Sequence, residues 1–133
     1  MTDDIRWLTP RMVQAFHLET LQRHGGGTGL RDEALLLSAL ARPRNRAAYD
    51  KSATLFDLAA EYGAGVVGNH PFVDGNKRTG LLAAVVFLSL NGYRLQADEA
   101  DIVATIEALA AGRVDVERLS AWFERNSAPQ DAG

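Results

Sequence analysis

The stretch that decides the fold is residues 70–90, His-Pro-Phe-Val-Asp-Gly-Asn-Lys-Arg-Thr followed by Gly-Leu-Leu-Ala-Ala-Val-Val-Phe-Leu-Ser-Leu. Its first ten residues are rich in polar and charged side chains, whereas in residues 81–90 only Ser89 is polar. A helix that is apolar on every side must be enclosed by other elements. The stretch therefore predicts a buried central helix over residues 77–90 with a polar loop at its amino end.

Helix start and stop signals divide most of the remaining chain into five further helices. Their expected starts are Thr9-Pro10, Asp32-Glu33, Thr54, Asp98 and Asp115, all residues that favour helix amino ends. The first helix should end at the glycine cluster 25–29, and the second must end before Pro43. No Gly-Lys-Ser/Thr follows the glycine cluster, so it reads as a helix-ending turn and not as a phosphate loop.

These signals predict an all-α fold, a compact bundle of about six helices around the central apolar helix with negligible β structure. Residues 93–95 are expected to form a short extended connector. We expect one domain over residues 1–126 and a disordered tail over residues 127–133.

The composition of the chain argues against nucleic-acid-binding and membrane proteins. The chain has 133 residues, 47% hydrophobic and 23% charged, which is ordinary for one globular domain. Fourteen basic residues face 17 acidic ones, a net charge of −3 that argues against direct nucleic-acid binding. Cysteine is absent, no signal-peptide core is evident, and the longest apolar run is about half of a membrane span. We therefore expect a soluble cytoplasmic protein that does not bind membranes.

The loop carries a candidate general base and a candidate metal ligand. Pro71 disfavours helical geometry at the residue before it, so His70 should stand at a helix–loop junction, free to accept a proton. Phe72 is expected to anchor the loop in the core. Asp74 could cap the following helix, but we favour Mg²⁺ ligation, since Mg²⁺ on a nucleotide needs only one or two protein carboxylates.

The four residues after Asp74 are candidates for phosphate binding at a helix amino end. Gly75 would let the backbone approach phosphate closely, while Lys77 supplies a point charge and Arg78 a planar fork. Asn76 either orients the loop or donates to phosphate, and the sequence leaves both roles open. Thr79 could contact ligand or bond back to a carbonyl, with neither favoured.

The motif resembles the signature of the Fic/Doc (Fido) superfamily, His-x-Phe-x-Asp-Gly-Asn-(Gly or Lys)-Arg. It is most similar to the Doc (death-on-curing) toxin family of toxin–antitoxin modules. Fic-type members, which transfer AMP, continue Gly-Asn-Gly-Arg-x-x-Arg, whereas this chain has Lys77 and Leu81 at the second glycine and second arginine, as Doc-type members do. Further similar positions extend the resemblance from about Trp7 to Phe123: Gly29–Asp32, Leu36–Ala39, Arg42-Pro43, Asn69 and Asn91–Tyr93.

The resemblance implies a toxin that uses ATP and Mg²⁺ to phosphorylate a protein hydroxyl, a threonine of elongation factor Tu, and so inhibits translation. His70 would be catalytic, Asp74 would hold the metal, and residues 75–78 would bind the nucleotide. A Phd-like antitoxin would neutralise the protein. Segment 42–49, arginine-rich and without helix signals, is a candidate to dock the acceptor or the antitoxin, with a solvated loop as the alternative.

Three alternatives remain beside the kinase. One is a Fic-type AMP transferase, and another is a non-catalytic module that grips an antitoxin or a phosphorylated partner. The third is an RNA-cleaving toxin, which the acidic charge balance and the lack of a second acid or base beside His70 disfavour.

Overall fold

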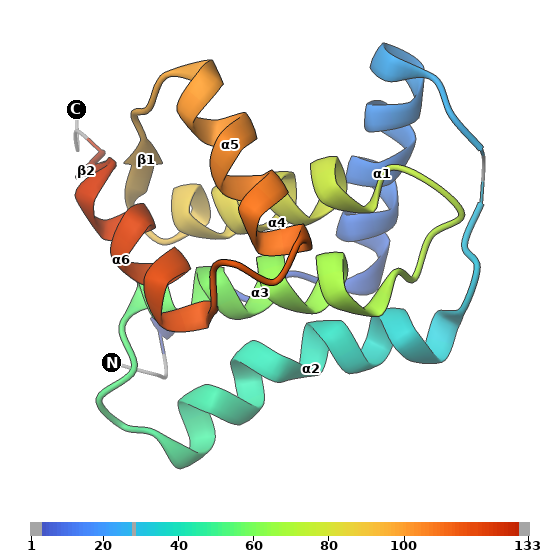
Figure 1. Cartoon of the computed structure of the whole chain (residues 1–133). Coiled ribbons are helices and arrows are strands. Elements are labelled where there is room, and N and C mark those ends of the chain that lie inside the picture. Colours follow the sequence, from blue (N-terminus) through green and yellow to red (C-terminus); the bar gives the residue numbers. More distant parts are fainter. Residues whose placement is uncertain (1–3, 28, 131–133) are drawn as a thin grey trace.

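The computed structural model describes residues 4–27 and 29–130, and in this part of the chain it has six helices and one two-stranded sheet (Figure 1). The helices are α1 (Pro10–His24), α2 (Glu33–Tyr49), α3 (Leu55–Asn69), α4 (Asn76–Leu90), α5 (Glu99–Ala110) and α6 (Val116–Arg125). The expected all-α fold is confirmed. None of the helices in the described ranges is long and apolar enough to cross a membrane.

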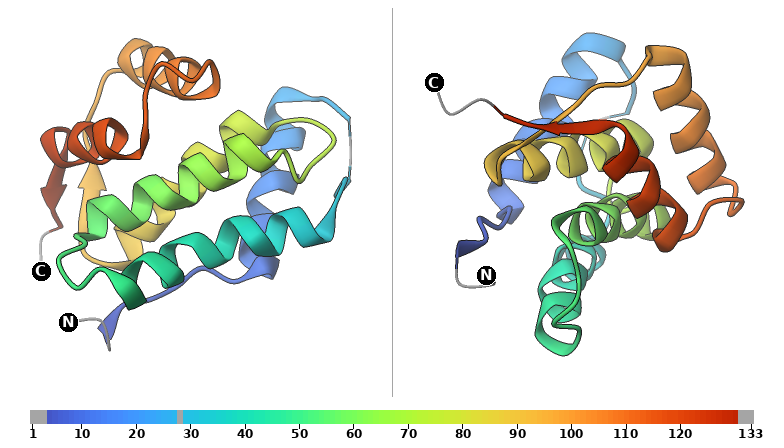
Figure 2. Two further views of the ribbon diagram at one scale, coloured as in Figure 1. Left: turned by 60° about the horizontal axis from the view of Figure 1, so that its bottom comes forward. Right: turned by 90° about the vertical axis from the view of Figure 1, so that its left-hand side faces the viewer.

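The centre of the molecule is the pair α3 and α4, which pack side by side. Figure 2 shows α2 along one side of α3 and the α5–α6 pair on the other, while α1 packs against α4. Ten of the fifteen residues of α3 are buried, so α3 shares the central place with α4. Glycines permit this closeness, because a Cβ on Gly80 would lie 2.9 Å from Val67 Cγ2 and 3.2 Å from the Gly63 carbonyl oxygen.

Helix α2 runs through Pro43, so the prediction that it ends before this residue is wrong. A proline inside a helix removes one backbone hydrogen bond and crowds the carbonyl four residues back, at a cost of about 3 kcal/mol. Here Pro43 is fully buried, and the Ala39 carbonyl packs so tightly on α3 that a Cβ on Gly65 would lie 3.1 Å from its oxygen. Tertiary packing between α2 and α3 thus offsets the local penalty.

The continued helix carries two arginines into an ion-pair network with α3. Glu61, 8% exposed, accepts from Arg42 Nη2 at 2.9 Å and from Arg46 Nη1 at 3.0 Å. Arg46 also lies 3.8 Å from Asp57, which accepts a 2.6 Å bond from Ser120 of α6. Burial opposes ionisation of Asp57, but the bond from Ser120, the bond from its own helix cap and the Arg46 charge together hold its pKa below the usual 3.8.

The expectation that segment 42–49 lacks helical structure is wrong as well. Arg42 and Arg46 bond inward to Glu61, and the Arg44 guanidinium lies 5.1 Å above the Trp7 ring. These contacts use the arginines of the segment within the protein. The docking role expected of this segment stays a prediction.

The end of the chain differs from the disordered tail that the sequence predicted over residues 127–133. β2 (Ser127–Pro129) pairs antiparallel with β1 (Tyr93–Leu95), and Gln130 N donates to the Gly92 carbonyl at 2.9 Å. Residues 127–130 are therefore not disordered, and the connector expected over residues 93–95 is a strand. Residues 131–133 of the expected tail lie outside the described residues.

Candidate functional site

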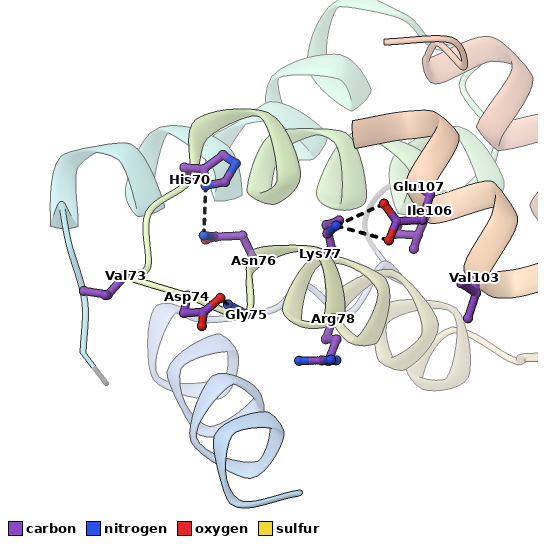
Figure 3. A pocket seen from close by; sticks show the side chains of 10 residues that line it. All are labelled: His70, Val73, Asp74, Gly75, Asn76, Lys77, Arg78, Val103, Ile106 and Glu107. Carbon is purple, nitrogen blue, oxygen red and sulfur yellow. Dashed lines mark hydrogen bonds and ion pairs between the residues drawn. The ribbon is translucent and has the colours of Figure 1, made fainter. Parts of the chain in front are cut away.

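A cavity of about 420 Å³ opens between the start of α4, the loop before it and helix α5 (Figure 3). Six of the seven residues that the sequence proposed for the site line this cavity, and Phe72 lies buried behind it. The cavity wall is completed by one further loop residue and three residues of α5. The lining residues are His70, Val73, Asp74, Gly75, Asn76, Lys77, Arg78, Val103, Ile106 and Glu107.

His70 ends α3 in a left-handed backbone conformation, with φ 52° and ψ 54°, and its side chain is exposed. It is the only residue other than glycine with positive φ in the described ranges. Arg31, just before α2, braces this turn: its Nε donates to the His70 carbonyl at 2.8 Å and its Nη2 to the Asn69 carbonyl at 3.1 Å. These carbonyls have no intrahelical partner at a helix end, so Arg31 stabilises the conformation that turns His70 out of the helix.

The Asn76 side chain organises the loop. It is 4% exposed, its Oδ1 accepts from Phe72 N at 3.0 Å, and its Nδ2 donates to the Phe72 carbonyl at 3.0 Å. The two Phe72 bonds fix the amide orientation, so the second hydrogen of Nδ2 points to His70 Nδ1, 3.1 Å away. Both amide hydrogens are thus used, and only the backbone N–H of Asn76 remains for the phosphate role that the sequence proposed.

The Asn76 contact also sets the tautomer of His70. Since Nδ1 accepts a hydrogen bond, the neutral imidazole carries its proton on Nε2. The basic lone pair of the resting protein is therefore on Nδ1, directed at an amide donor.

His17, in α1, lies beneath the loop. Its ring is 4% exposed, stacks on Phe72 with a centroid distance of 3.9 Å, and bonds through Nε2 to the Asp74 carbonyl at 2.7 Å. The carbonyl can only accept, so Nε2 carries a hydrogen. The signal for this role was present in the sequence, because His17 continues the helical stripe of buried Val13 and Thr20.

Asp74 directs its carboxylate toward the cavity and does not cap α4, whose N-cap is Gly75 with no side-chain bond. Its Oδ1 accepts from Gly75 N at 2.8 Å. The glycine turn after α1 passes directly over the loop: a Cβ on Gly26 would lie 2.7 Å from Asp74 Oδ2, and one on Gly27 would lie 2.8 Å from Val73 Cγ1. The glycine cluster thus leaves space beside Asp74 that any side chain would fill.

The cations of the motif point in different directions, as Figure 3 shows. Lys77 Nζ pairs with Glu107 of α5, at 3.0 and 3.1 Å. Arg78 lines the main cavity and also a second one of about 300 Å³ between α1 and α4, where Leu81 lies as well. Thr79 Oγ1 is buried without a hydrogen-bond partner among the described residues, so the bond back to a carbonyl that the sequence left open is not made.

The arrangement has the chemistry to hold an anion, with one carboxylate at its edge. Thr79 N is the first donor of α4 to bond within the turn, to the Gly75 carbonyl, which leaves the N–H groups of residues 76–78 without an intrahelical acceptor. The described residues hold no group of three side chains that could bind a metal by themselves. Asp74 as a single hard oxygen donor fits a Mg²⁺ ion whose other ligands come from phosphates and water.

The chain is similar in sequence to known proteins. Residues 7–88 match the family model described as the Fic/DOC family. The chain is 29% identical over 121 residues to the protein kinase doc of Escherichia phage P1, covering 91% of this chain and 95% of that protein. It is 44% identical over 75 residues to the toxin Doc of Mycolicibacterium smegmatis, 56% of this chain and 58% of that one. The chain therefore belongs to the Fic/DOC family.

Proposed function

We propose that this protein is a Doc-type toxin that transfers the γ-phosphate of ATP to a hydroxyl group of a protein. The observation that carries the proposal is the placing of His70, Asp74 and the cationic start of α4 around one cavity. The two relatives, one named a kinase and one a toxin, support the same reading.

The start of α4 would hold the polyphosphate. The N–H groups of residues 76–78 and the positive end of the helix dipole attract phosphate oxygens. Arg78 adds a planar fork suited to two oxygens, and Lys77 adds a charge once it leaves Glu107. Asp74 would hold Mg²⁺, which when bound offsets charge on the phosphates.

His70 would take the proton of the acceptor hydroxyl. A small rotation of its exposed ring away from Asn76 would free the Nδ1 lone pair for this purpose. The acceptor oxygen then forms a bond to the γ-phosphorus, and the bond from that phosphorus to the bridging oxygen breaks. ADP leaves with the electron pair, and the new charge is offset by the groups that hold the polyphosphate.

The proposal also names an acceptor protein and an antitoxin. By family resemblance the acceptor is a threonine of elongation factor Tu, modification of which inhibits translation in the cytoplasm, and a Phd-like antitoxin blocks the site. The competing activity within the family is AMP transfer, as in Fic-type members. Leu81 argues against it, since an aliphatic residue stands at the position of the second arginine and lines the neighbouring cavity.

Label transfer tests the reaction. Purified protein is incubated with elongation factor Tu or cell extract and with ATP labelled at either the α- or the γ-phosphate. Label from γ-labelled ATP alone is expected in the acceptor, and the His70→Ala variant should lose about 10²–10⁴ in rate while it keeps ATP affinity. Label from α-labelled ATP would establish AMP transfer, and an unaffected His70→Ala variant would remove the assigned base.

A further inference from the structure

An ion pair closes one side of the cavity. Lys77, in the first turn of α4, and Glu107, in the last turn of α5, meet at 3.0 and 3.1 Å with side chains 47% and 52% exposed. Exposed pairs of this kind contribute little to stability. The pair can therefore open at small cost when another charge competes for either member.

Helix stability does not explain the presence of Glu107. The other acidic residues of α5, Glu99 and Asp101, lie in its first turn, where the helix dipole favours negative charge. Glu107 lies at the opposite end, where the carbonyl groups make a carboxylate unfavourable. The position of this acid follows instead from what it faces, the cavity and Lys77.

A bound polyphosphate would compete with Glu107 for Lys77. Phosphate oxygens carry more charge than a carboxylate and would also hold the backbone donors beside Lys77. Once the Lys77 ammonium turns to phosphate, Glu107 becomes an unpaired carboxylate on the cavity wall. No covalent bond changes in this exchange.

The surroundings of Glu107 suit a protein segment with a cation. Val73 and Val103 are apolar and yet 55% and 50% exposed, on the loop and on α5 respectively, and both line the cavity. Such surfaces can contact the aliphatic stem of an arriving Lys or Arg side chain. The cavity has one other carboxylate, Asp74, whose Oδ1 accepts from the backbone.

We propose that Glu107 exchanges partners during the reaction. It pairs with Lys77 in the nucleotide-free protein and with a basic side chain of the acceptor once the nucleotide is bound. The protein thus selects hydroxyl acceptors that have a Lys or Arg close to the modified residue, and nucleotide binds first. This inference rests on the proposed phosphotransfer function and specifies its acceptor class.

Transfer to designed peptides tests the selectivity. Three threonine peptides are identical except for Lys, Gln or Glu on either side of the threonine. With γ-labelled ATP, wild type should favour the Lys peptide over the Gln peptide by about two- to five-fold in kcat/KM, as expected for one exposed charge pair. Glu107→Gln should remove this preference and Glu107→Lys should reverse it, whereas the matched variant Glu99→Gln on the same helix should keep it.

The kinetics of Glu107→Gln distinguish the proposed partner exchange from a purely structural role of Glu107. Loss of the competitor for Lys77 should leave KM for ATP unchanged or lower in Glu107→Gln, while kcat/KM for the Lys peptide falls. A variant that merely damaged the fold would weaken both substrates. Equal peptide preferences in wild type and Glu107→Gln would overturn the inference.

Binding separates this inference from the function on which it rests. Anisotropy of the labelled Lys peptide should report tighter binding to wild type loaded with a non-hydrolysable ATP analogue and Mg²⁺ than to nucleotide-free protein. In Glu107→Gln the analogue should make no difference. If no acceptor is ever phosphorylated, the proposed function fails, and this comparison still decides the role of Glu107. An analogue effect that is the same in both proteins would refute it.

Discussion

At the scale of single residues, the loop before α4 depends on a few buried polar contacts. Asn76 joins the backbone of Phe72 to the His70 ring, and His17 joins the Asp74 carbonyl to the core. Arg31 donates to the His70 carbonyl and so stabilises the turn at the end of α3. The side chain proposed for proton transfer is thus placed by Asn76 and Arg31.

Replacement of Asn76 by Asp should damage both the fold and the site. A carboxylate oxygen would stand where Nδ2 now donates, so the bond to the Phe72 carbonyl becomes a repulsive contact at a position that is 4% exposed, and His70 would have to carry its proton on Nδ1 to keep its bond. We expect a loss of about 2–4 kcal/mol in the free energy of unfolding, measured by urea denaturation. Asn45→Asp on the exposed face of α2 is the matched control and should cost under about 0.5 kcal/mol. A loss no greater than the control's would show that these contacts are not made.

At the scale of elements, the packing of α3 against α4 fixes the position of the site, since the loop of residues 70–75 joins the end of α3 to the start of α4. The crossing requires glycine at position 80, where a Cβ would meet Val67 Cγ2 at 2.9 Å and the Gly63 carbonyl oxygen at 3.2 Å. The backbone oxygen cannot move without shifting α3. At position 80, helix propensity favours alanine, whereas packing against α3 favours glycine.

Two glycine-to-alanine variants separate propensity from packing. Gly80→Ala should lower the free energy of unfolding by about 1–2 kcal/mol, because the overpacking outweighs the better helix propensity of alanine. Gly68→Ala in α3 adds a methyl group with no atom within 4 Å and should raise stability by about 0.5–1 kcal/mol. Thermal and urea unfolding of both variants provide the measurement. A stabilised Gly80→Ala protein would mean that the helices are farther apart than described.

At the scale of the whole molecule, a network of charges ties α2, α3 and α6 together on the side away from the loop. Asp57 is its meeting point: it accepts from Ser120 at 2.6 Å and from Thr54 N at 2.8 Å, and Arg46 lies 3.8 Å away. These contacts hold the pKa of Asp57 below 3.8 against the opposing effect of burial. An acid whose pKa falls on folding stabilises the protein only while it is ionised.

Protonation of Asp57 at low pH should therefore lower the free energy of unfolding. Its contribution is fully present above the unfolded-state pKa of about 3.9 and is lost as the pH falls through the lower folded-state value. Asp57→Asn should be less stable than wild type at neutral pH and should lose less stability on acidification below about pH 4. Urea unfolding at a series of pH values measures both slopes, with Ser120→Ala expected to lie between them. Parallel curves for wild type and Asp57→Asn would contradict the assignment.

Local signals account for the parts of the fold that the sequence predicted well. Thr9, Thr54 and Asp115 cap their helices through bonds to residues three positions ahead, and such contacts need no partner from elsewhere. Six of the residues that the motif proposed for the site line one cavity, because a loop and one helix turn keep neighbours together.

Contacts between distant segments account for the rest. Helix α2 continues through Pro43 because it packs against α3, and residues 127–129 form a strand because residues 93–95 supply the hydrogen bonds. Long-range contacts also bring His17, Arg31 and Glu107 to the site from outside the motif. The sequence by itself determined the helices, the family and the candidate residues of the site, since caps, apolar periods and motif spacing are local. Only the tertiary structure decided which groups are free to act, since burial and pairing depend on what the whole chain packs against them.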